Sequence, residues 1–106
     1  MSISFTPSII NRLKREIADM QKKSTEDKQK LEKATSKIKQ LQRDMKKSTS
    51  PNDLSNKMTR INKLNQEIDE LTRSQKDIAK QLVLKKAALN EHLAKEQAQA
   101  SHKSEE

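Results

Sequence analysis

An unbroken alternation of three- and four-residue steps between apolar positions runs through each half of the chain. This spacing is the heptad repeat of helices that pack side by side in a coiled coil. A disordered chain would not keep this phase over so many steps, so we expect two long helices with one apolar seam between them. The first run is Ile10, Leu13, Ile17, Met20, Ser24, Asp27, Leu31, Ala34, Ile38, Leu41 and Met45, and the second is Leu54, Lys57, Ile61, Leu64, Ile68, Leu71, Gln75, Ile78, Leu82, Lys85, Leu89 and His92.

The segment KKSTSPNDLS, residues 46–55, separates the two runs in a sequence that contains no glycine. Ser50 suits the N-cap of a helix, Pro51 suits its first position, and Asp53 stands where a capping-box acid would. Pro51 also disfavours helical geometry at Ser50, which ends the first helix. We therefore expect the chain to turn back on itself here.

The first helix begins by the same device, with Thr6 as N-cap, Pro7 as first helical residue and Phe5 stapled onto Ile10. The heptad pattern is lost after about Gln97, so the end of the chain is expected to fray. The expected parts are a lead-in over 1–6, a first helix over 7–49, a second helix over 50–98 and a frayed tail over 99–106.

One antiparallel register fits both runs. If the chain folds back at Pro51, residues whose numbers add to 102 lie level, as Leu31 does with Leu71. The same register sets Asp27 opposite Gln75, with Ser24 one layer away. We expect these three to form a polar layer that helps to fix the register, as buried polar residues do in other coiled coils. The alternative is that Asp27 points to solvent where the helices separate.

The composition rules out a layered globular core, because only 30% of the residues are apolar and Phe5 is the only aromatic residue. The N-terminus lacks the apolar run of a signal peptide, and no stretch has the ~20 apolar residues of a membrane span. We expect an all-α, antiparallel two-helix coiled-coil hairpin that packs into a multi-helix oligomer. We expect it in the cytoplasm.

Nothing in the sequence supports catalysis. It has no cysteine, no glycine-rich phosphate loop and no zinc-binding or nucleophile motif. His92 belongs to the seam, and Glu67 with Glu70 is interpreted as a solvated acidic pair. We therefore expect no enzyme activity in this chain, and no catalytic, cofactor-binding or metal-binding residue.

A second group of apolar residues lies off the seam. Val83, Leu84 and Ala87 take heptad positions b, c and f. A lone hairpin has no use for apolar residues there, and its single seam would be marginal. They are candidates for a self-association surface that makes the chain a homo-oligomer, although scattered surface residues are an alternative interpretation.

Positive charge is concentrated in the first half of the chain. Residues 9–47 hold 13 basic and 6 acidic residues, a net +7, against 10 basic and 9 acidic residues, a net +1, from Pro51 onward. A lysine-rich helix can bind nucleic acid or another anionic surface. Without aromatic or arginine-rich reading residues, specific nucleic-acid recognition is not expected.

The turn and the end of the second helix carry a further sequence pattern. A lysine-rich helix runs into Ser/Thr-Ser-Pro, a leucine follows three residues on, lysine-rich heptads come next, and a Leu-x-Lys-Glu-like stretch ends the second helix. The residues here are Lys47, Thr49, Ser50, Pro51, Leu54, Lys57, Ile61, Leu93, Lys95, Glu96 and Gln97. Through them, residues 39–97 resemble the N-terminal coiled-coil region of bacterial TIR-domain proteins, which are NAD-consuming immune effectors.

The resemblance implies a segment that gathers subunits so that attached TIR domains meet. That family cleaves NAD with a glutamate of its α/β TIR domain. No part of this sequence alternates strands and helices in that way, so no catalytic residue is transferred to it. The implied role is an oligomerisation scaffold of a bacterial defence protein. A free-standing adapter for another protein's helices and a lysine-rich binder of nucleic acid or anionic surfaces remain alternatives.

Overall fold

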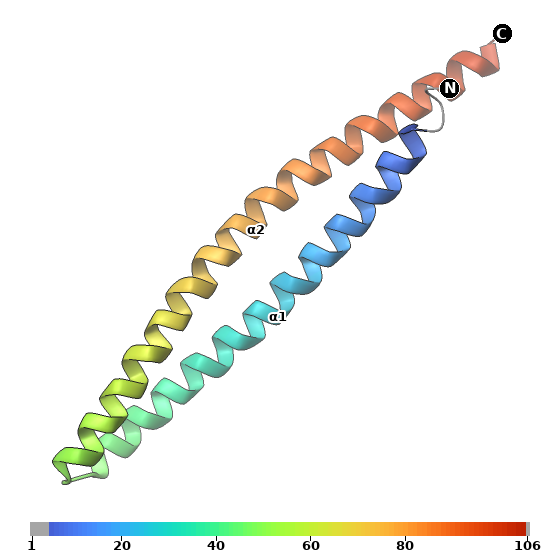
Figure 1. Cartoon of the computed structure of the whole chain (residues 1–106). Coiled ribbons are helices and arrows are strands. Elements are labelled where there is room, and N and C mark those ends of the chain that lie inside the picture. Colours follow the sequence, from blue (N-terminus) through green and yellow to red (C-terminus); the bar gives the residue numbers. More distant parts are fainter. Residues whose placement is uncertain (1–4, 106) are drawn as a thin grey trace. The chain divides into compact units, whose positions relative to one another are not determined.

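The computed structural model contains two long helices, α1 (Phe5–Lys47) and α2 (Pro51–Glu105) (Figure 1). The structure describes the backbone of residues 5–105 and the side chains of residues 8–98, and this part of the chain contains no strand. The fold is therefore all-α, as predicted. It divides into two compact units, which we call the turn unit (residues 24–77) and the terminal unit (residues 1–23 and 78–106).

Helix α1 begins earlier than the sequence predicts. Thr6 and Pro7 lie inside its first turn, so Thr6 does not precede the helix as an N-cap. Proline is tolerated there because the first N–H groups of a helix have no intrahelical partner. The proposed staple of Phe5 onto Ile10 lies outside the described side chains.

Helix α2 continues beyond residue 98 and includes residues 99–105, where fraying was expected. This segment, QASHKSE, lacks glycine and proline, and helix propensity persists where the heptad pattern stops. Loss of heptad phase is therefore a weak signal for the end of a helix. At the turn, α1 ends at Lys47 rather than at residue 49, and residues 48–50 connect it to α2.

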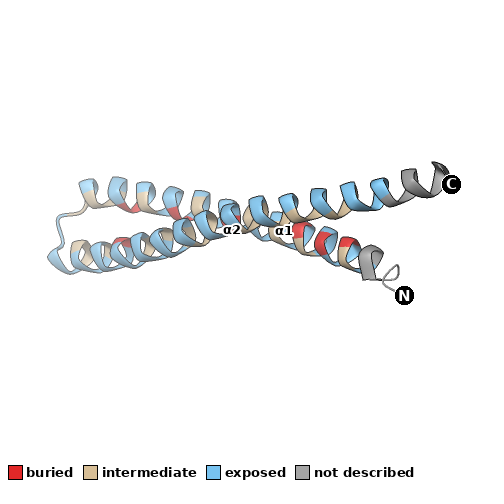
Figure 2. Ribbon diagram, turned by 90° about the horizontal axis from the view of Figure 1, so that it is seen from above, coloured by how far each residue is buried: buried red, intermediate tan, exposed pale blue. Residues whose placement is uncertain are grey.

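In the turn unit, the two helices pack antiparallel along the predicted seam. Ala34, Leu41 and Ile61 are buried, and the remaining apolar seam residues are half-buried. Figure 2 shows buried and half-buried residues on the facing sides of the helices and exposed residues outside. The half-buried members are Leu31, Ile38, Met45, Leu54, Leu64, Ile68 and Leu71.

In the terminal unit, Ile10, Leu13, Ile17 and Ile78 are buried, while Met20, Leu82 and Leu89 are half-buried. Every seam position that the heptads predict is thus buried or half-buried. None of the described large side chains is fully buried, however. A seam between only two helices leaves its edges open to water, so each side chain contributes less than complete burial would.

The register can be tested with cysteine pairs in the turn unit. Leu31→Cys with Leu71→Cys should form an intrachain disulfide under mild oxidation, because the register predicted from the sequence sets the two positions level in the seam. Leu31→Cys with Ile61→Cys is the control, displaced by ~15 Å along the helix axis. Non-reducing electrophoresis of dilute protein distinguishes the pairs, and preferential crosslinking of the control would contradict the register.

Candidate functional site

The polar layer of the seam is centred on Asp27, which is only 5% exposed. Its carboxylate Oδ2 accepts a hydrogen bond of 3.2 Å from the hydroxyl of Ser74. Asp27 therefore lies between the helices, and the alternative interpretation, in which it points to solvent, is wrong. A buried carboxylate needs such a partner because removing it from water without a hydrogen bond is costly.

Gln75 and Ser24 form the second contact of the layer. The Ser24 hydroxyl donates to Oε1 of Gln75 at 3.1 Å, and Nε2 of Gln75 donates to the Ser24 backbone carbonyl at 2.7 Å. One amide thus bridges a side chain and the backbone of the other helix. Because both bonds need the same axial position of α2 against α1, they favour one register.

The sequence predicts the members of this layer better than their pairing. It sets Asp27 opposite Gln75, whereas the structure pairs Gln75 with Ser24 and Asp27 with Ser74. Ser74 was missed because it lies beside the seam rather than on it. Its position next to Gln75 was the available signal. No buried polar side-chain atom within the described residues lacks a partner.

The hairpin turn is capped by Ser50. The Asp53 N–H donates to Ser50 Oγ at 3.4 Å, and the Leu54 N–H donates to the Ser50 carbonyl at 3.0 Å. These are the contacts of an N-cap residue, and Pro51 is the first residue of the helix. The reciprocal capping-box bond is absent here, because the Ser50 N–H donates to Ser48 Oγ at 3.4 Å.

Asp53 interacts instead along its own helix. Lys57 Nζ donates to both carboxylate oxygens at 2.6 Å. The bond from Lys57 and a second from the Ser48 hydroxyl hold the pKa of Asp53 below its usual 3.8. The polar seam residue Lys57 is thereby explained, because its stem covers the seam while its charge reaches Asp53.

Lys85 is a second lysine of the seam, and it lies in the terminal unit. Its ammonium group donates to Glu16 Oε2 on the other helix. This hydrogen bond is the main reason that the pKa of Glu16 lies below its usual 4.5, with a further contribution from the positive charge of Arg12. Lys85 is thus accommodated in the seam by an ion pair between the helices. This pair was not predicted from the sequence.

The outer apolar surface is formed by Val83, Leu84 and Ala87 on α2. Val83 is 68% exposed and Leu84 63%, and Ala87 is also exposed. The terminal unit's own seam leaves them uncovered, as their heptad positions predict. Contiguous exposed apolar side chains can form part of a protein interaction surface.

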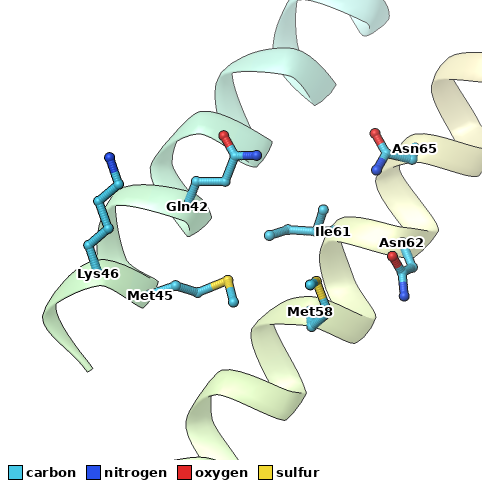
Figure 3. A pocket seen from close by; sticks show the side chains of 7 residues that line it. All are labelled: Gln42, Met45, Lys46, Met58, Ile61, Asn62 and Asn65. Atoms are coloured by element: carbon cyan, nitrogen blue, oxygen red, sulfur yellow. The ribbon is translucent and has the colours of Figure 1, made fainter. Parts of the chain in front are cut away.

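A hollow of about 540 Å³ lies beside the turn, in the turn unit. Figure 3 shows Met45 and Ile61 directed into the space between the helices, with Met58 beside Ile61 at the edge of α2. Met58 is 50% exposed. Lys46 is the only ionisable residue that lines the hollow, so it offers no acid–base pair or nucleophile.

No family model, curated protein or solved structure matches this chain. Within the described residues, no three or more His, Cys, Asp or Glu side chains are grouped to hold a metal ion. Neither helix, over the same part of the chain, has a stretch apolar and long enough to span a membrane. Functional inference therefore depends on the polar layer and the exposed surfaces.

The contribution of the polar layer can be measured by replacing Asp27 and Gln75 together with leucine. The added apolar burial outweighs the lost hydrogen bonds, which contribute ~0.5–1.5 kcal/mol each. We expect the melting temperature to rise by about 5 °C, with additional oligomeric species in sedimentation because the register constraint is gone. Gln29→Leu with Gln66→Leu, at exposed sites, is the control. A double variant less stable than the parent would contradict this role of the layer.

The Asp53–Lys57 contact predicts an acid-dependent loss of stability. Because the folded-state pKa of Asp53 is lowered, its stabilisation is present above pH 3.8 and is lost as the pH falls through the lower folded value. Asp53→Asn should therefore destabilise the hairpin at neutral pH but approach the wild type in strong acid. Urea unfolding across this range tests it, with Asp69→Asn at an exposed site as control. A difference that persists at the lowest pH would contradict the assignment.

Proposed function

We propose that this chain is an oligomerisation module, and that its outer apolar surface is the contact between copies. The observation that carries this proposal is the exposure of Val83 and Leu84, at 68% and 63%, on a helix whose seam does not use them. Burying such side chains fully contributes about 1.5–3 kcal/mol each. A symmetric interface repeats each residue in every copy, so the contribution is multiplied.

The seam supplies a second reason for association. No described large side chain is fully buried, so the two-helix hairpin leaves much of its apolar surface partly accessible to water. A bundle of several helices covers such edges, which is how short helical hairpins reach useful stability. Self-association would therefore compensate for the incomplete burial of the seam.

The resemblance at residues 39–97 supports a more specific role. In a TIR-type defence protein of the bacterial cytoplasm, such a module would bring effector domains together so that clustering controls their NAD-consuming activity. The Ser50–Pro51 turn carries that resemblance. The module itself supplies the contacts between copies, and the attached domain supplies the chemistry.

The proposal predicts that Val83→Glu with Leu84→Lys abolishes association before it affects the helices. The substitutions leave the seam intact and the net charge unchanged. Sedimentation should show a smaller species than the wild type, while circular dichroism keeps its helical signal. Thr35→Lys with Ser36→Glu is the matched control, because it makes the same charge change at exposed polar positions of α1.

A wild-type chain that stays monomeric when concentrated to tens of micromolar would overturn the proposal. The outer apolar surface would then fit a helix of a different protein, and the adapter function would replace self-assembly.

A further inference from the structure

One side of the turn unit carries a basic groove, which we define as Lys30, Lys33 and Lys37 of α1 with Arg60 and Lys63 of α2. These side chains line two adjoining shallow hollows of about 220 Å³ each, which share Lys37 and Leu64. Ala34 and Leu64 contribute apolar lining. Glu67 is the only acidic residue that lines either hollow.

The positive charges of the groove exceed the negative ones, since five cations line it with one acidic residue, Glu67. None of its five cations forms an ion pair in the described residues. Elsewhere the chain pairs its seam lysines, since Lys57 contacts Asp53 and Lys85 contacts Glu16. In one hollow of the groove, by contrast, Lys37 of α1 lies with Arg60 and Lys63 of α2, so like charges come from both helices. This arrangement opposes helix packing and favours an external anion.

The spacing of the lysines suits an anion with repeated charges. Lys30, Lys33 and Lys37 follow each other at steps of three and four, so they share one face of α1 over ~10 Å. Phosphates of one DNA strand follow each other at ~3.4 Å along the duplex axis. The row on α1, with Arg60 and Lys63 opposite, can therefore contact several phosphates of one backbone. We propose that the basic groove binds the phosphate backbone of double-stranded nucleic acid without reading its sequence.

The groove favours a duplex over other polyanions. It has no aromatic side chain on which the bases of a single strand could stack, since Phe5 is the only aromatic residue of the chain. Insertion of an amphipathic helix at a membrane surface uses large exposed apolar side chains beside the charges. Among the side chains of residues 8–98, the exposed large apolar ones are Met58, Val83 and Leu84, and none of them lines the groove. This inference goes beyond the proposed assembly function and does not depend on it.

The test is fluorescence anisotropy of the full chain with a labelled DNA duplex of mixed sequence across a salt series. Five phosphate contacts predict a slope of log affinity against log salt of about −4.5, or a ~500-fold loss of affinity between 50 and 200 mM salt. Lys30, Lys33 and Lys37 are replaced together by glutamine, which should reduce the slope to about −1.8. The helical signal should remain, because glutamine is a good helix former.

The matched control replaces Lys28, Lys39 and Lys76 with glutamine. These lysines are exposed, belong to the same unit and do not line the groove. The control should keep a slope close to that of the wild type. Equal losses in the two triple variants would overturn the proposal, because binding would then follow net charge alone. It would also be overturned by an absence of duplex binding at 50 mM salt, by tighter binding of single strands, or by binding to phosphatidylserine vesicles but not to the duplex.

Discussion

Long helices of this composition remain helical in water only while each covers the apolar stripe of the other. The buried isoleucines and leucines of the seam, such as Leu13, Leu41 and Ile61, provide that cover. Isolated helical segments are marginal, and tertiary packing of one face supplies most of the stability of a protein helix. The capped turn at Ser50 makes this packing intramolecular, so it does not depend on protein concentration. Every other feature of the chain, including its exposed surfaces, rests on that arrangement.

An apolar seam alone would tolerate several registers, because similar aliphatic residues recur at each layer. The contacts of Gln75 with Ser24 and of Ser74 with Asp27 distinguish among them. A shift by one heptad would separate these groups and leave Asp27 without its hydrogen bond. The cost of an unsatisfied buried carboxylate exceeds the small differences between apolar layers. Four polar side chains thus contribute specificity more than stability to the hairpin.

The heptad repeat was sufficient to predict the two helices, the turn and every seam position, because each rests on periodicity or on local capping chemistry. The pairings inside the polar layer could not be derived in the same way. They depend on offsets smaller than a helical turn, and Ser74 reaches Asp27 from beside the seam. The contact of Lys85 with Glu16 was missed for the same reason. The N-terminal boundary was wrong because a proline in the first turn of a helix does not specify which position it takes.

Two features of the chain work against the stability of an isolated hairpin. Val83 and Leu84 expose apolar surface, and the five cations of the basic groove line two adjoining hollows with Glu67 as the one acidic residue. Neither feature is needed for the turn, the seam or the register. Uncharged polar residues at the same positions would leave all three intact. Sequences that satisfy the rules of packing and charge elsewhere tend to break them where a surface has another task. The exposed apolar residues fit a contact between copies, because such a contact would cover them. The cations of the basic groove fit an anion, because an anion would balance their charge. The two surfaces differ in chemistry and lie in different units. A salt series therefore distinguishes binding through the two surfaces, because salt screens contacts to phosphate strongly and affects apolar contacts little.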